Sequence, residues 1–111
     1  MKISYNARMT KKDIFNAATN SLPLQKLTTP ISVVACGVGE DVSNETGELA
    51  QVGYIVTATG EIYGTISKTA ITAIENLGEF LLELPENEPV EICVQHRKSK
   101  SDRDFITLAL V

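Results

Sequence analysis

Basic side chains are concentrated near the end of the sequence, in a segment with the composition of a phosphate-binding loop. Four of the ten lysines and arginines fall within residues 96–103, namely Arg97, Lys98, Lys100 and Arg103. Such side chains neutralise phosphates, and the serines between them can donate hydrogen bonds to phosphate oxygens. The segment therefore favours contact with a nucleic-acid backbone. The alternative is a solvated hairpin loop whose charges keep the protein soluble.

Aromatic side chains that could stack on nucleic-acid bases are few in this sequence. Each stacked base contributes about 1–3 kcal/mol, with little preference for sequence. Tyr63 alternates with Ile62, so it faces outward on a strand if Ile62 faces the core. Phe105 precedes Ile106 in the same way, close to the basic segment, whereas Tyr54 shares a face with two valines. We expect Tyr63 to stack on bases; for the other two, a structural role and a stacking role both stay open.

The net charge of −4 argues against a polyanionic partner, but the distribution of the charges reverses this. Residues 1–26 and 97–111 together hold nine of the ten basic residues and three of the fourteen acidic ones. Residues 27–96 hold one basic residue, Lys68, and eleven acidic ones. Because the local field steers a polyanion, we expect a basic face on an acidic body, with Lys11 and Lys12 contributing to the basic side.

Catalytic, metal and cofactor sites find little support in the sequence. The chain has one histidine, His96, and its two cysteines, Cys36 and Cys93, lie in apolar runs without C-x-x-C spacing. This set is too small for a four-ligand zinc site or a disulfide framework, so buried thiols in a cytoplasmic protein are expected. No glycine-rich phosphate loop, membrane span or signal peptide is recognisable. We therefore expect neither an enzyme nor a bound metal or cofactor.

Hydrophobic periodicity predicts five strands and one long helix. The helix begins after Ser67, a suitable N-cap, and its apolar residues recur at helical spacing. Residues 39–48 are expected to form a polar loop, and the basic residues 96–102 the last hairpin loop. Strands are expected at residues 31–38, 49–57, 61–65, 90–95 and 105–110. This order, β-β-β-α-β-β, is that of the five-stranded OB-fold barrel, which binds oligonucleotides across its second and third strands and the flanking loops.

The first thirty residues are expected to form an N-terminal extension to an OB-fold domain of residues 31–111. Within this extension, Thr10 and Asp13 have the spacing of a capping box, which predicts the start of a short helix or turn. Whether the extension covers the barrel, contacts a neighbour or stays flexible is left open by the sequence.

One stretch at the third strand and the helix start resembles a known motif. Residues 60–69, GEIYGTISKT, resemble the G-x-[IL]-Y-x-x-I-S-K-T stretch in the single-stranded-DNA-binding proteins of small protein-primed podoviruses of the phi29 kind. Residues 13–17 and 99–110 are similar to two further segments of that family, in the same order. The resemblance implies sequence-independent binding that coats and protects displaced single strands during viral DNA replication. It also implies a place in the host cytoplasm, alongside viral replication proteins.

The same resemblance implies that Tyr63 stacks on bases and that Lys68 contacts phosphate. Members of the family carry tyrosines at the end of the first strand and in the following loop, whereas residues 35–47 hold none here. Binding is therefore expected to depend more on charge. The alternatives are RNA binding, or an OB-fold protein-interaction module, for example a viral inhibitor of a host protein that uses the acidic residues 40–48.

Overall fold

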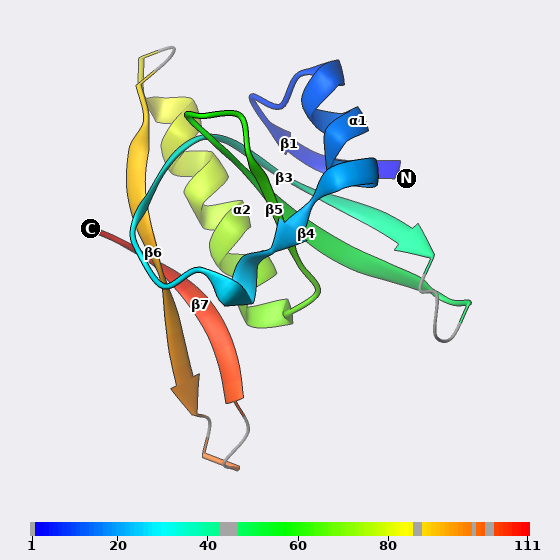
Figure 1. Cartoon of the computed structure of the whole chain (residues 1–111), viewed down its shortest axis with the longest axis vertical. Helices are drawn as coiled ribbons and strands as arrows, with labels where there is room; N and C mark the ends of the chain where they lie inside the picture. Colours follow the sequence, from blue (N-terminus) through cyan, green and yellow to red (C-terminus); the bar gives the residue numbers. More distant parts are fainter. Residues whose placement is uncertain (1, 43–46, 86–87, 99, 102–103) are drawn as a thin grey trace.

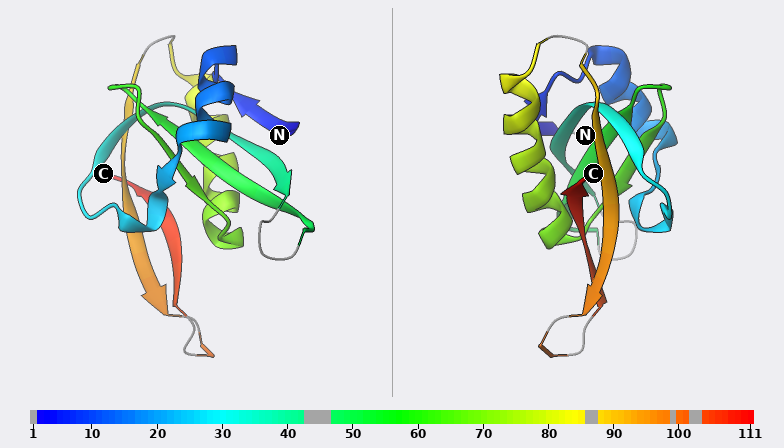
Figure 2. Two further views of the ribbon diagram at one scale, coloured as in Figure 1. Left: turned by 45° about the vertical axis from the view of Figure 1, so that its right-hand side comes forward. Right: turned by 90° about the vertical axis from the view of Figure 1, so that its left-hand side faces the viewer.

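The chain folds into a strongly curved β-sheet with one helix on each of its faces (Figures 1 and 2). The computed structural model describes residues 2–42, 47–85, 88–98, 100–101 and 104–111. The helices are α1 (Lys11–Asn20) and α2 (Lys68–Glu83), with a short 3-10 turn, η1 (Leu24–Lys26). The strands are β1 (Lys2–Ala7), β2 (Leu22–Pro23), β3 (Ile31–Val42), β4 (Leu49–Thr57), β5 (Ile62–Thr65), β6 (Val90–Lys98) and β7 (Asp104–Leu110).

The strand order explains why the sheet curls without closing. The order is β2-β5-β4-β3-β6-β7, and β1 also pairs with β3. The long strand β3 pairs with β4 on one side, and on the other with β6 near its start and with β1 further along. The two ends of the curled sheet, β2 and β7, are not paired with each other in the described part of the chain. The result is an OB-like half-barrel with an open seam, and the predicted β+α fold class is confirmed.

The strand count is higher than predicted, because the first thirty residues contribute to the sheet. β1 pairs with residues 36–40 of β3, and the two residues of β2 pair in parallel with Tyr63 and Gly64 of β5. Between them, α1 begins with the predicted capping box: Thr10 Oγ1 accepts from the amide of Asp13, whose carboxylate accepts from the amide of Thr10. Whether residues 1–30 are a separable extension stays a prediction.

Two predicted loops are partly strand in the structure. The loop expected from residue 39 is wrong up to Val42, because β3 continues and pairs with residues 49–52 of β4. The hairpin loop expected from residue 96 is also too long, since His96, Arg97 and Lys98 pair with Ile106, Phe105 and Asp104. In both places the strands run out past the body of the sheet. A two-stranded projection can carry polar residues on either face, so the hydrophobic alternation that marks a strand is lost.

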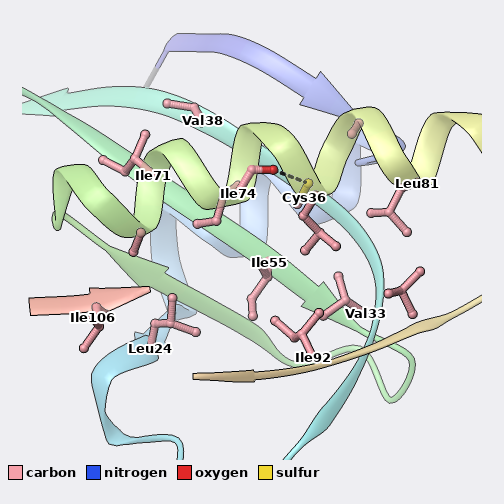
Figure 3. Packing of buried hydrophobic residues seen from close by; sticks show 14 residues of the cluster. Leu24, Val33, Cys36, Val38, Ile55, Ile71, Ile74, Leu81, Ile92 and Ile106 are labelled. Atoms are coloured by element: carbon pink, nitrogen blue, oxygen red, sulfur yellow. Dashed lines mark hydrogen bonds between the residues drawn. The ribbon is translucent and has the colours of Figure 1, made fainter. Parts of the chain in front are cut away.

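The main core lies between α2 and one face of the sheet (Figure 3). The apolar residues of α2 recur at helical spacing after Ser67, whose hydroxyl accepts from the amide of Ala70, as predicted. α2 packs directly on β4 at Gly53, where a Cβ atom would lie 2.7 Å from Ile74 Cδ1. The largest fully buried side chains are Leu24, Ile55, Ile74, Leu81, Ile92, Val33, Val38 and Cys36.

A second, smaller core lies on the opposite face of the sheet, beneath α1. Its buried members are Met9, Ala17, Ala35, Tyr54, Val56 and Ile62. Successive side chains of a strand point to opposite faces, so β4 sends Ile55 into the main core and its two neighbours into the second one. The strands β3, β4 and β5 are thus covered on both faces.

Arg8 ties the segment between β1 and α1 to the end of α2. Its guanidinium donates hydrogen bonds to the carbonyls of Leu84 and Pro85, and its backbone has φ 70°. A non-glycine residue in this left-handed region carries some strain. The contacts to carbonyls at the end of α2 offset it, because those groups have no partner within the helix.

The expected burial of the two thiols is found at Cys36 but only in part at Cys93. Cys36 is fully buried, its Sγ donates to the carbonyl of Ile74 at 3.4 Å, and burial raises its pKa to about 12 (Figure 3). Cys93 is only half-buried, and both cysteines are free. In the described residues, no group of three or more His, Cys, Asp or Glu side chains could hold a metal ion. Within the same ranges, neither helix combines the length and the apolar character needed to cross a bilayer.

Candidate nucleic-acid interface

A groove of about 720 Å³ lies at the open seam of the half-barrel. One wall comes from the end of the sheet that contains β2 and β5, through Gln25 in η1 and Ser67 just after β5. The other wall is the projecting end of β6 and β7, which both views show extending away from the body (Figure 2). Its full lining is Gln25, Ser67, His96, Arg97, Lys98, Asp104, Phe105 and Ile106. We call this cavity the seam groove.

The pairing of β6 with β7 brings a cation and an aromatic ring to the same place in this groove. Arg97 is directly opposite Phe105, and the side chains of directly opposite residues in an antiparallel pair point to the same face. His96 is opposite Ile106, which is buried, so this second pair lies on the face toward the core. The guanidinium of Arg97 also donates a hydrogen bond to the side chain of Gln95. The projection therefore presents Arg97 and Phe105 together on one face. Lys98, directly opposite Asp104, points to the other face, and all four residues line the groove.

The start of α2 adds a further basic residue beside the groove. Ser67 lines the seam groove, and Lys68, the first residue of α2, is exposed. Lys68 lines a smaller depression of about 440 Å³ that reaches Thr107 of β7. At the tip of the projection, Lys100 is exposed as well. Of the predicted phosphate-contacting residues, Arg97 and Lys98 thus line the seam groove, Lys68 lies beside it, and Lys100 lies at the tip of the projection.

Two predicted basic residues lie far from this opening, and one falls outside the described residues. Lys11 and Lys12 are exposed in the first turn of α1, which begins at the end of the molecule opposite the β6–β7 projection (Figures 1 and 2). Arg103 lies outside the residues that the structure describes. The basic residues from the two ends of the sequence therefore do not form one continuous face in the described part of the molecule.

The three aromatic candidates have different surroundings. Phe105 is half-buried and lines the seam groove. Tyr54 is only 3% exposed, beneath α1, and burial followed by the charge of Asp41 raises its pKa. A base could reach the ring of Tyr54 only if α1 moved away. The structural role that the sequence left open for this residue is the one that the fold gives it.

Tyr63 corrects the assumption about which face of β5 is the core. Ile62 is buried as expected, but in the second core beneath α1. Tyr63 is on the other face, opposite Ile55, where it packs at the margin of the main core and keeps part of its ring exposed. Its hydroxyl donates to Glu61 at 3.0 Å; partial burial, and then this carboxylate, raise its pKa. Tyr63 is thus on the face opposite Ile62, as expected, but it is only partly exposed because both faces of this strand are covered.

The acidic side chains of α2 lie mostly away from the groove. Glu75, Glu79 and Glu83 are exposed along a helix that begins at the seam groove and ends at the opposite end of the molecule (Figure 1). Tyr5 covers part of this row: its hydroxyl donates to Glu79 at 3.2 Å, and burial together with Glu79 raises its pKa to about 12. The positive charges at the groove are thus separated in space from this acidic row, an arrangement that directs a polyanion to the groove.

Sequence reasoning missed both members of the groove wall that faces the β6–β7 projection. Gln25 carries no signal of its own, since its place depends on the parallel pairing of β2 with β5. Ser67 was recognised as a helix cap, but its position at the seam follows only from the curl of the sheet. Both are uncharged hydrogen-bonding residues, of the kind that contact phosphate and sugar.

The comparison with protein families identifies the family to which the chain belongs. The family model described as phage single-stranded DNA-binding protein, of the phi29 type, matches residues 2–111. The chain belongs to this family. It is thus a single-stranded-DNA-binding protein of phage replication, as the motif at residues 60–69 implied. No curated protein and no solved structure matches the chain.

Membership of this family gives the protein its partner class. The partner is single-stranded DNA, a ligand whose phosphates need cations and whose exposed bases need stacking surfaces. The seam groove offers both in one place, through Arg97 and Lys98 on the one hand and Phe105 on the other. Tyr63 and Lys68 belong to the motif on which the family resemblance rests, and Lys68 directly follows the groove residue Ser67.

Proposed function

We propose that the protein coats single strands displaced during phage DNA replication, and protects them from nucleases, by holding the strand in the seam groove. The observation that carries this proposal is the meeting of Arg97, Lys98 and Phe105 at the opening of the half-barrel. Phosphates lie along Arg97, Lys98 and Lys100, with Lys68 on the opposite side of the opening. Bases stack on Phe105 and on the exposed part of Tyr63.

The shape of the site and its stacking residue favour single strands over duplex DNA. A seam groove between a helix start and a two-stranded projection admits one flexible backbone, whereas a duplex presents its bases paired and out of reach of stacking side chains. The contacts involve the backbone and the faces of the bases, and both are shared by all sequences. We therefore expect coating to be independent of the base sequence of the DNA, with an affinity that falls as the salt concentration rises.

Two titrations test the proposal directly. Tyrosine fluorescence is followed while an unstructured oligothymidine is added at increasing salt, and a labelled single strand is challenged with a nuclease in the presence of protein. We expect quenching, a negative salt slope and protection that requires enough protein to cover the strand. A strand that binds but is cleaved at the unprotected rate would contradict the coating role while leaving the DNA-binding activity intact.

RNA binding is separated from DNA binding by competition. Stacking and phosphate contacts are indifferent to the sugar, whereas Gln25 and Ser67 could contact it. We expect oligothymidine to displace an equal length of oligouridine, because the family acts on DNA. Of the acidic residues considered for a protein-interaction module, Glu40 and Asp41 lie in β3 and Glu48 directly precedes β4. The remaining one, Glu45, lies outside the described part.

A further inference from the structure

A carboxylate is fixed beside the ring of Tyr63 by the turn that joins β4 to β5. The hydroxyl of Tyr63 donates to Glu61 Oε2 at 3.0 Å, and Thr59 Oγ1 donates to Glu61 Oε1 at 3.2 Å. An ionised carboxylate has about four acceptor positions on its two oxygens. Since Glu61 is exposed, positions on both oxygens stay open to a ligand that approaches Tyr63.

The turn holds this carboxylate through a compact set of hydrogen bonds. The amide of Thr57 donates to the carbonyl of Glu61 at 2.9 Å, and the amide of Glu61 donates to Thr57 Oγ1 at 3.0 Å. Thr57 Oγ1 lies 3.0 Å from Thr59 Oγ1, and Gly60 supplies the positive φ of 91° that the turn requires. The position of the carboxylate is therefore set before a ligand arrives, which lowers the cost of ordering it on binding.

A fixed carboxylate beside a ring on which a base stacks favours some bases over others. It repels phosphate, but it can accept a hydrogen bond from the edge of a base, as glutamate does with the amino group of cytosine. Cytosine, adenine and guanine each carry an exocyclic amino group. Thymine has none; its single donor on this edge is the imide N3–H, which lies between two carbonyl oxygens that repel the carboxylate. Bases of single strands present these edges freely, because they are unpaired.

We propose that Glu61 reads the base that stacks on Tyr63, accepting a hydrogen bond from its amino group and disfavouring thymine at this one position. This proposal rests on the proposed function, since it requires a base on Tyr63. Coating stays independent of sequence order, because the other contacts are to phosphates and to the faces of bases. The expected consequence is a modest preference in base composition, about fivefold between oligocytidine and oligothymidine of equal length.

The test compares the two oligonucleotides on matched variants at neutral pH. Glu61→Gln removes the charge and leaves a side chain that can both donate and accept, so the affinity ratio of oligocytidine to oligothymidine should fall to about one. The control is Glu79→Gln, which removes the same charge from another carboxylate bonded to a tyrosine hydroxyl, that of Tyr5. The control should keep the ratio of the unaltered protein. Thr59→Val, which removes one of the two donors that orient Glu61, should lower the ratio in part.

The outcomes separate this proposal from the proposed function. Equal affinities of the unaltered protein for the two oligonucleotides would overturn it. So would an unchanged ratio in Glu61→Gln, or a loss of the ratio in both glutamine variants, which would indicate an effect of net charge alone. If the unaltered protein bound neither oligonucleotide, the proposed function itself would fail.

Discussion

Two regions of this half-barrel, the face beneath α1 and the open seam, differ in how far the N-terminal residues cover them. On the face of β3, β4 and β5 that carries Tyr54, α1 covers the strands and turns an aromatic ring into a core residue. At the seam, β2 and β7 are not paired with each other in the described residues, and a groove lies between Gln25 of η1, Ser67 and the basic projection. An OB-fold binds across its second and third strands and the loops beside them. Here α1 covers one face of the corresponding strands, and we propose that binding is therefore displaced toward the last hairpin.

The largest effect is expected on stability, from a substitution that removes packing beneath α1. Tyr54→Ala should lower the free energy of unfolding by about 3–5 kcal/mol, because it leaves a cavity beneath α1 where the ring is 3% exposed. Urea or thermal unfolding measures this. Tyr54→Phe, which keeps the ring, should fold nearly as well as the unaltered protein. A Tyr54→Ala variant with unchanged stability and lost DNA binding would show that this face, and not the seam, is the interface.

The next effect concerns the charges of the open region. Replacing Arg97, Lys98 and Lys100 together by alanine should lower the affinity for oligothymidine by about 100-fold at low salt. The slope of log affinity against log salt should become about 2 less negative, since each phosphate contact on a single strand contributes roughly 0.7. Titrations at several salt concentrations give both numbers. A lower affinity with the slope retained would mean that these residues do not contact phosphates.

A smaller effect is expected from the aromatic residue of the groove. Phe105→Ala should weaken binding by about tenfold with the salt slope unchanged, because stacking involves no counterion release. Phe105→Tyr keeps a ring and serves as the control. Because Phe105 is half-buried, folding of both variants is checked by unfolding curves before affinities are compared. Equal affinities of the two variants would remove Phe105 from the interface.

The smallest effect is expected at the far end of the molecule. Lys11→Ala/Lys12→Ala removes two charges from the first turn of α1, remote from the seam groove (Figure 1). Surface electrostatics at such distances are screened within about 10 Å at 0.1 M salt, so affinity and salt slope should change little. The same titration as for the triple variant applies. A loss as large as that of the triple variant would place the strand across both ends of the molecule.

The contrast also shows which parts of the molecule the sequence could predict. Where apolar residues alternate or recur at helical spacing, as in β4 and α2, element and orientation follow from local pattern. The pattern could not tell that both faces of β5 are buried, since that depends on α1, which packs there from far away in the sequence. Tyr63 lies on the face opposite Ile62, as the alternation predicts, but that face is the margin of the main core rather than open surface. The motif around Tyr63 named the family correctly.

The site was predictable in its residue types more than in its assembly. The basic segment can be recognised from composition alone. Because it projects from the sheet, Arg97 and Lys98 lie at the seam groove. The wall opposite, made by Gln25 and Ser67, depends on how two ends of a sheet approach without pairing. That approach is a property of the whole curl, and no short stretch of sequence encodes it.

The most direct test of the seam groove as the DNA interface is a map of backbone amide chemical shifts during titration with oligothymidine. The largest changes are expected at Gln25, Ser67, Arg97, Lys98 and Phe105, with smaller ones at Tyr63 and almost none in α1. Changes concentrated on α1, or along the acidic row of α2 from Glu75 to Glu83, would contradict the central claim. Changes on α1 would place the strand on the face that α1 covers, and changes along α2 would place it on the opposite side of the sheet.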